Sequence, residues 1–273
     1  MKKHSVLKAA ALTAAAYTVS LRGRTKHPDL EILRRYRFAH RGYHDKPVVP
    51  ENSLPAFRRA IEHGWGAELD VHLMKDGTLA VIHDSSLLRT AGADVQIEDL
   101  TREELENYRL EGTDERIPLF DEVLALFENT TPLIIELKAA NGNHFALSKA
   151  VCERLDSYKG VFCIESFDPM VVADMRELRP GICRGQLAEN FLKDKGALDP
   201  VRSVLATGLI GNALAKPDFI AFKFEDRSCI SNALCLKLWG IQGVAWTIRS
   251  KRDLLTAEAE GLIPIFEKFD PEV

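Results

Sequence analysis

From Phe38 to Phe266, short apolar runs alternate with segments whose apolar residues recur at helical spacing. Such alternation predicts repeated strand–helix units around a parallel sheet. Eight units in succession are the content of one (β/α)8 barrel. We therefore expect an α/β fold of the TIM-type barrel class. The predicted strands are Phe38–Gly42, Ala67–Leu73, Leu133–Lys138, Val161–Phe167, Gly181–Leu187, Phe219–Phe224, Gly243–Ile248 and Leu262–Phe266.

The helical patterns between these strands complete the predicted barrel. No linker rich in Pro, Gly or Ser divides the region, so we expect one domain over residues 36–273 after an N-terminal helical segment, 1–35. Residues Lys193–Lys216 are expected to form a loop with short helices over one face. The predicted helices are Leu54–His63, Arg102–Tyr108, Asp121–Phe127, Phe145–Tyr158, Pro169–Leu178, Ser231–Trp239 and Lys251–Glu258.

Charge and cysteine content exclude some functions. The net charge of -4 gives no basic surplus, so we do not expect a nucleic-acid binder. The five cysteines are odd in number and show neither a CxxC motif nor a Cys/His ligand spacing, which predicts reduced, mostly buried thiols.

The N-terminal segment, MKKHSVLKAAALTAAAYTVSLRGRTKH, leaves three interpretations open. Its alanine-rich stretch is interrupted by Lys8 and is shorter than the roughly 20 apolar residues of a membrane span. It could be a degenerate signal anchor, a helix lying on an anionic membrane surface, or a soluble helix. We expect a chain that is cytoplasmic or associated with a membrane through this segment, and no feature predicts its oligomeric state.

One segment, TLAVIHD, departs from the strand–helix alternation. Only the KDG sequence at residues 75–77 separates it from the strand containing ELDVHL, and Asp-Gly between two strand patterns is a strong hairpin signal. A turn centred on Asp76-Gly77 would pair residues whose numbers sum to about 153. We therefore expect a β-hairpin over Leu79–Asp84 that places His83 opposite Asp70.

Two strands carry charged side chains at alternating positions. Glu68 and Asp70 share one side of their strand, and Glu136 and Lys138 share one side of another. The alternatives are a solvent-facing edge or an internal Glu–Lys bridge, but the outer face of a barrel is covered by helices. Isolated carboxylates are costly to bury. The pattern predicts that Glu68, Asp70 and Glu136 hold one divalent cation, Ca²⁺ or Mg²⁺, with an anionic substrate between it and Lys138.

His40 and Arg41 follow the first strand, at the end of the barrel where active sites collect. An arginine can bind phosphate oxygens with two parallel hydrogen bonds, and imidazoles suit proton transfer between oxygens. His40 and His83 are therefore the candidate acid/base pair. The other histidines considered are expected at the surface or at helix ends: His44, His63, His72 and His144.

Several sequence blocks together resemble the glycerophosphodiester phosphodiesterase family. The blocks run in order from about residue 37 to 266: AHRGYHDKPVVPENSLPAF, GAELDVHLMKDGTLAVIHDSSLLRTAG, LTREEL, IPLFDEVL, PLIIELK, IESFDP and VAWTIRS. Each motif alone is weak, but their order is specific. The resemblance implies a TIM-type barrel whose ELD-to-HD hairpin covers the site.

The resemblance also implies an activity and a division of roles. It implies hydrolysis of glycerophosphodiesters to glycerol 3-phosphate and an alcohol, with a bound Ca²⁺ or Mg²⁺. A glycerol hydroxyl attacks phosphorus, and water then opens the cyclic phosphate. Two alternatives are a phospholipase-type phosphotransferase that acts on lysophospholipid or phospholipid and leaves a cyclic phosphate, and an inactive binding barrel. The implied roles are acid/base for His40 and His83, metal binding for Glu68, Asp70 and Glu136, and phosphate contact for Arg41 and Lys138.

Further residues follow from the same blocks. The resemblance places Trp246 against the glycerol, although a core tryptophan is an alternative, and Glu51 beside the substrate. Asn52 or Ser53 is expected to cap the following helix. Two features depart from the family pattern: Arg249 replaces a frequent Asn, and the last strand ends in IFEKFD rather than IITD.

Overall fold

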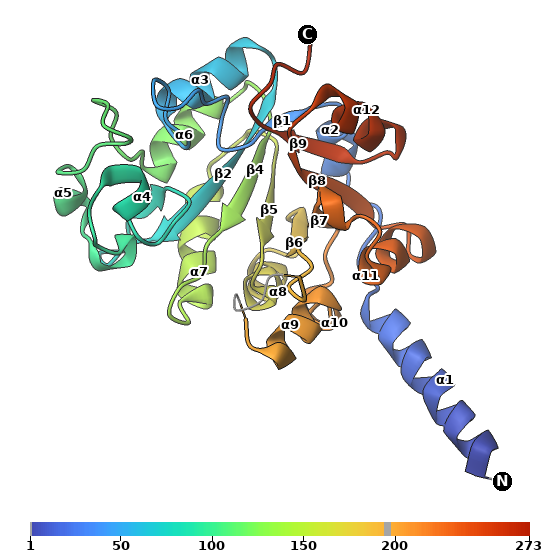
Figure 1. Cartoon of the computed structure of the whole chain (residues 1–273). Coiled ribbons are helices and arrows are strands. Elements are labelled where there is room, and N and C mark those ends of the chain that lie inside the picture. Colours follow the sequence, from blue (N-terminus) through green and yellow to red (C-terminus); the bar gives the residue numbers. More distant parts are fainter. Residues whose placement is uncertain (1, 194–197) are drawn as a thin grey trace.

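The computed structural model describes residues 2–193 and 198–273, with side chains from residue 7 onward. Eight parallel strands close into a barrel, because β1 pairs with both β2 and β9. The barrel order is β1-β9-β8-β7-β6-β5-β4-β2, and β3 pairs with the outer edge of β2 (Figure 1). The strands are β1 Phe38–Ala39, β2 Gly66–Leu73, β3 Leu79–Val81, β4 Leu133–Leu137, β5 Phe162–Ser166, β6 Arg184–Ala188, β7 Phe219–Lys223, β8 Gln242–Ile248 and β9 Ile263–Phe266.

All eight predicted barrel strands are confirmed, and the differences lie at their ends. The first strand stops at Ala39 because Arg41 and Gly42 both have positive φ angles, 55° and 78°, which turn the chain out of the sheet. The sixth begins three residues later than predicted, at Arg184. The barrel strands are buried on both faces, as expected of strands packed between the barrel interior and the helices.

The predicted helices are also present. Helix α3 begins after Ser53, whose hydroxyl accepts a hydrogen bond from the Ala56 amide, and α8 has both predicted ends. The predicted Lys193–Lys216 segment contains α9 and α10, while its residues 194–197 lie outside the described part of the chain. The α-helices are α1 Lys2–Ser20, α2 Asp29–Leu33, α3 Leu54–Glu62, α4 Leu88–Ala91, α5 Arg102–Leu105, α6 Phe120–Phe127, α7 His144–Leu155, α8 Pro169–Leu178, α9 Pro200–Thr207, α10 Asn212–Ala215, α11 Ile230–Ala233 and α12 Lys251–Ala259.

The hairpin is present, but its predicted register is wrong by one residue. Val71 pairs with Val81 and Leu73 with Leu79, so partner numbers sum to 152. The reason is a three-residue loop: the Met74 amide donates to the Thr78 carbonyl, and Gly77 takes a φ of +84°. His83 therefore lies beyond the ladder. The residue opposite Asp70 is Ile82, whose amide donates to the Asp70 carbonyl at 3.1 Å.

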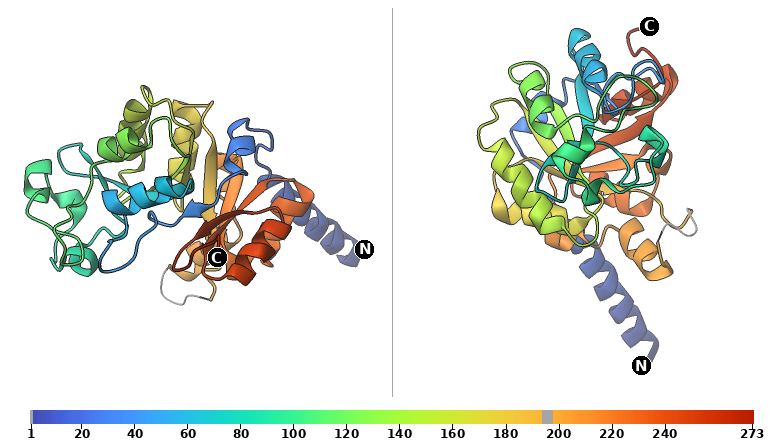
Figure 2. Two further views of the ribbon diagram at one scale, coloured as in Figure 1. Left: turned by 90° about the horizontal axis from the view of Figure 1, so that it is seen from above. Right: turned by 90° about the vertical axis from the view of Figure 1, so that its left-hand side faces the viewer.

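The N-terminal segment joins the barrel through its second half. Leu21, Leu30 and Leu33 are buried in the core, whereas α1 projects away from the barrel (Figures 1 and 2). The last turn of α1 touches the barrel, where the Tyr17 hydroxyl donates to the Gly208 carbonyl at 3.1 Å. Among the helices of the described residues, none is both long and apolar enough to cross a membrane. The division at residue 35 stays a prediction, as do the three interpretations of α1.

All five cysteines are free thiols. Cys163, Cys183 and Cys235 are buried, and the other two are partly buried, in agreement with the predicted burial.

A buried ion pair fastens the segment after α1 to the barrel. Asp218 is fully buried, and it accepts hydrogen bonds from Arg24 Nε at 2.7 Å and Nη2 at 2.6 Å. We expect Asp218→Asn to lower the free energy of unfolding by about 2–3 kcal/mol, since half-exposed Arg24 would keep partial hydration. Urea denaturation measures this. The exposed Asp114→Asn is a matched control with an expected change within about 0.5 kcal/mol; equal values for both variants would contradict the prediction.

Candidate active site

A cavity of about 400 Å³ lies at the mouth formed by the carboxyl ends of the strands. Barrel enzymes place their reacting groups at this end. Seven of the nine predicted site residues line the cavity. The other two, Asp70 and Glu51, are buried and do not line it. The lining residues are His40, Arg41, Glu68, His83, Glu136, Lys138, Glu165, Phe167, Leu187, Glu189, Lys223, Trp246, Thr247, Arg249 and Ile265.

Three carboxylates meet on neighbouring strands. In the parallel register Asp70 pairs with Glu136, and Glu68 lies two residues earlier on the same strand as Asp70. One oxygen from each of Glu68, Asp70 and Glu136 lies within 4.8 Å of the others, and all three side chains are buried. Carboxylate oxygens at this spacing suit a hard divalent cation.

The electrostatics of this cluster favour an added positive charge. Burial raises the pKa of Glu68 well above its usual value, and the neighbouring Asp70 and Glu136 raise it further. Burial raises the pKa of Glu136 to about 7, although Lys138 opposes the shift. Lys138 Nζ lies 2.8 Å from Glu136 and 3.1 Å from Asp70, so one ammonium faces several carboxylates. The residues present therefore fit a bound divalent cation.

His40 is fixed at the first strand end. Its amide donates to the Phe266 carbonyl at 2.9 Å, and its ring Nδ1 lies 2.8 Å from Glu267 Oε2. Its Nε2 lies 3.9 Å from Glu68 Oε2, on the side of the acidic cluster. Burial lowers the pKa of His40 to about 4, although the Glu267 hydrogen bond acts in the opposite direction. A neutral ring can accept a proton at Nε2.

His83 reaches the same cavity from the hairpin. Its Nδ1 lies 2.6 Å from Asp84 Oδ1, and Arg89 Nε donates to the other Asp84 oxygen at 2.5 Å. Burial lowers the pKa of His83, while the charge of nearby Asp70 raises it. His83 and Asp70 are thus near enough for their charges to interact, as predicted, although they do not pair in the ladder.

Arg41 and Lys138 present the cations predicted for an anionic substrate. Both line the cavity, and Arg41 Nη1 donates to Glu51 Oε1 at 2.9 Å. Glu51 faces three cations, because Arg89 also donates to it at 2.6 Å and Lys46 contacts it. Burial would raise the pKa of Glu51, but these cations lower it overall. Glu51 is buried and hydrogen-bonded to Arg41 but does not line the cavity, and its place beside the substrate stays a prediction.

Trp246 is part of an aromatic wall of the cavity, and its predicted contact with the glycerol stays a prediction. The ring lines the cavity and also packs on the lower core, with Phe167 edge-on at 5.8 Å between ring centroids. Phe167 in turn packs against Phe191, with 6.0 Å between the ring centroids. These rings give the cavity an apolar side.

Two of the other histidine predictions are wrong. His72 is buried, with Nδ1 2.7 Å from Glu98 and Nε2 3.1 Å from the His83 carbonyl, so it supports the hairpin. The side chain of His44 is only 6% exposed, with its Nε2 3.8 Å from Glu267 Oε2. His63 follows the last residue of α3 and His144 begins α7, as predicted.

Sequence reasoning missed three contributors to the site. Glu165 pairs in register with Glu136, is buried, and has a raised pKa mainly because of burial. The IES sequence resembles the IIE of β4, so strand position alone could have indicated it. Asn52 donates to Asp70 at 2.8 Å, while Ser53 alone provides the helix cap. The role of Glu267 has no local sequence signal, because its partners are distant in the chain.

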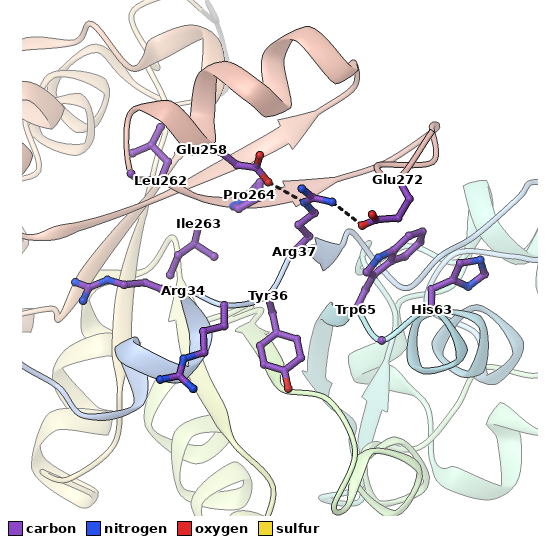
Figure 3. Close-up of a pocket in the computed structure, with 13 residues that line it drawn as sticks. Arg34, Tyr36, Arg37, His63, Trp65, Glu258, Leu262, Ile263, Pro264 and Glu272 are labelled. Carbon is purple, nitrogen blue, oxygen red and sulfur yellow. Dashed lines mark hydrogen bonds and ion pairs between the residues drawn. The ribbon is translucent and has the colours of Figure 1, made fainter.

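A larger cavity lies at the opposite end of the barrel (Figure 3). It has a volume of about 530 Å³ and is lined in part by Arg34, Tyr36, Arg37 and Trp65. Arg37 is occupied there, since it donates to Glu258 at 2.7 Å and to Glu272 at 2.5 Å. Among the described residues, a group of three carboxylates that could hold a metal ion occurs only at the carboxyl ends of the strands. The smaller cavity is therefore the candidate active site.

The fold and the site define a barrel with a candidate divalent-cation centre beside two imidazoles held by carboxylates. The model of the Glycerophosphoryl diester phosphodiesterase family matches residues 40–266. The chain therefore belongs to the glycerophosphoryl diester phosphodiesterase family, and its TIM-type barrel agrees with the resemblance.

Individual relatives support this assignment. A glycerophosphodiester phosphodiesterase of Caldanaerobacter subterraneus subsp. tengcongensis is 36% identical over 161 residues, covering 55% of this chain and 65% of the relative. Lysophospholipase D GDPD1 of Rattus norvegicus is 37% identical over 122 residues, 40% of this chain and 38% of the relative. The alignments thus span less than two thirds of these relatives.

A solved structure confirms the fold. An Oleispira antarctica phosphodiesterase, in complex with its product sn-glycerol-3-phosphate, superposes with a TM-score of 0.67 at 23% identity, covering 85% of this chain and 92% of that one.

Proposed function

We propose that this protein hydrolyses glycerophosphodiesters to glycerol 3-phosphate and an alcohol, using a divalent cation and a histidine acid/base pair. The observation that carries the proposal is the convergence of His40 and His83 on one cavity with Glu68, Asp70 and Glu136. Two cationic side chains, Arg41 and Lys138, line the same cavity. Among relatives, both the bacterial phosphodiesterase and the mammalian lysophospholipase D belong to this chemical class.

The proposed reaction moves protons between oxygens in two steps. One imidazole accepts the proton of a glycerol hydroxyl as its oxygen bonds to phosphorus, and the other donates a proton to the departing alcohol oxygen. Water then opens the cyclic phosphate with the two imidazoles in reversed roles. The carboxylates on each Nδ1 keep Nε2 available for these transfers.

The remaining side chains bind and orient the phosphodiester. Arg41 and Lys138 would bind phosphate oxygens, and Trp246 would pack against the glycerol carbons. Glu68, Asp70 and Glu136 would hold Ca²⁺ or Mg²⁺, which when bound stabilises negative charge on the phosphate oxygens.

A second candidate substrate class is a lysophospholipid presented at a membrane surface. Leu192, Val204 and Ile230 are 54%, 57% and 74% exposed, and they line a groove of about 450 Å³ next to Tyr17 of α1. Phe191, which packs on Phe167 of the site, directly precedes Leu192. Exposed apolar side chains at the mouth of a site suit contact with lipid. We propose peripheral membrane contact through this groove and α1.

One experiment separates these candidates. The full chain is assayed with Mg²⁺ or Ca²⁺ by coupled detection of glycerol 3-phosphate from glycerophosphocholine and glycerophosphoethanolamine, and by choline release from lysophosphatidylcholine on anionic vesicles. We expect release from the glycerophosphodiesters, with phosphorus NMR detecting glycerol 3-phosphate. Accumulated cyclic phosphate would favour a phosphotransferase, a rate confined to vesicles would favour the second candidate, and no release would contradict both.

A further inference from the structure

Glu267 lies outside the family motifs quoted above, yet it is at the centre of a charged cluster. Its Oε2 accepts a hydrogen bond from His40 Nδ1 at 2.8 Å, and its Oε1 accepts one from Arg249 Nε at 2.7 Å. His44 Nε2 lies 3.8 Å from Oε2, and Lys268 Nζ lies 3.6 Å from Oε1. Burial would raise the pKa of Glu267, but the hydrogen bonds from His40 and Arg249 and the nearby His44 lower it overall, so the side chain is an anion.

Three adjacent strand ends supply this cluster. His40 directly follows β1, Glu267 directly follows β9, and Arg249 directly follows β8, and these strands are neighbours in the barrel. The backbone ladder continues through them, because the His40 amide donates to Phe266 at 2.9 Å and the Glu267 amide to Ile248 at 3.0 Å. The backbone that carries the Glu267 carboxylate is therefore held by the hydrogen bonds of the sheet.

The two departures from the family pattern meet in this contact. Arg249 stands where the family often has Asn, and Glu267 lies in the altered ending of the last strand. A buried carboxylate needs a cationic or hydrogen-bonding partner, and the Arg249 side chain, half exposed, supplies one. Arg249 thus supplies the partner that the buried Glu267 carboxylate needs, so the two departures are explained together.

We propose that Glu267 and Arg249 are a positioning pair for His40. Glu267 holds the proton of His40 on Nδ1 and the ring in one orientation, so that Nε2 faces the cavity; Arg249 orients Glu267. His83 is held in the same way by Asp84 and Arg89. An orienting carboxylate on the far nitrogen of an imidazole fixes its tautomer and stabilises its protonated form. The proposal rests on the proposed role of His40 in hydrolysis.

The first test is kinetic. In the full chain with saturating Mg²⁺ and glycerophosphoethanolamine, we expect Glu267→Gln to lower kcat on the order of 10²-fold with KM within about threefold. Arg249→Gln is expected to lower kcat less, and to add nothing in the Glu267→Gln background because it acts through Glu267. Lys268→Ala, an exposed neighbour of the same carboxylate, is the matched control with kcat unchanged. Unchanged kcat in Glu267→Gln, or an independent Arg249 effect, would overturn the proposal.

A second readout does not depend on turnover. Nitrogen-15 NMR of the imidazoles should show His40 protonated on Nδ1 in the wild type, and this signature should weaken in Glu267→Ala. The affinity for Mg²⁺ should stay within about twofold; a tenfold loss would make Glu267 a metal ligand and overturn the positioning role. If no substrate is hydrolysed while the tautomer shifts as expected, the proposed function fails and the positioning role stands. An unchanged tautomer in an active enzyme overturns the positioning role alone.

Discussion

Replacing His40 or His83 by alanine should lower turnover of a glycerophosphodiester about 10²–10⁴-fold, the usual contribution of a general acid or base. Each imidazole lines the cavity, and each is held through Nδ1 by a carboxylate, at 2.8 Å for His40 and 2.6 Å for His83. Steady-state kinetics of the purified variants measures the loss. The double variant should be little worse than the poorer single variant, because the two groups act in one proton exchange.

The matched control for this prediction is His63→Ala. His63 is exposed at the end of α3 and lines the cavity at the opposite end of the barrel, so its replacement should leave kcat unchanged. Circular dichroism and thermal unfolding establish that the His40 and His83 variants keep the barrel. Either of these variants with near-wild-type turnover and an intact fold would remove that histidine from the reaction.

The barrel was predictable because its signals are local. Each strand is a short apolar run, and helix starts carry recognisable caps such as Ser53 before α3 and Asp168 before α8. The error in the hairpin register also has a local cause. Asp76-Gly77 indicates a turn, but a two-residue and a three-residue loop both place glycine at a positive φ. Only the choice between them decides which residue faces Asp70.

The site was predictable where the chemistry repeats along one strand and not where it depends on contacts between strands. Glu68 and Asp70 alternate on β2, so their shared side follows from strand geometry. Glu51 and His72 carry the same kinds of side chain, but their positions depend on Arg89 and Glu98, which lie 38 and 26 residues further along the chain. Sequence spacing alone does not indicate which of many distant residues will be the partner.

Neutralising one carboxylate of the acidic cluster should weaken metal binding and, in the absence of metal, stabilise the fold. We expect Glu136→Gln to weaken binding of Mg²⁺ and Ca²⁺ on the order of 10²-fold by titration calorimetry, because one of three buried ligands is neutralised. EDTA should abolish hydrolysis by the wild type, and added cation should restore it. Glu189→Gln, which changes a cavity carboxylate outside the cluster, is the matched control with unchanged affinity.

In EDTA, the free energy of unfolding of the Glu136→Gln variant should be higher than that of the wild type. Burial raises the pKa of Glu136 to about 7, above its ordinary value of roughly 4.3, so the ionised form disfavours the folded state at neutral pH. Glu136→Gln should therefore raise the free energy of unfolding at pH 7 without metal, and the gain should shrink as the pH falls and vanish at about pH 3, where the carboxyl is protonated in both states. With excess cation the wild type should instead be the more stable protein, because the cation binds only its folded cluster tightly. A wild type that retains full activity in EDTA, or gains no stability from either cation, would show that these three carboxylates do not form a metal site.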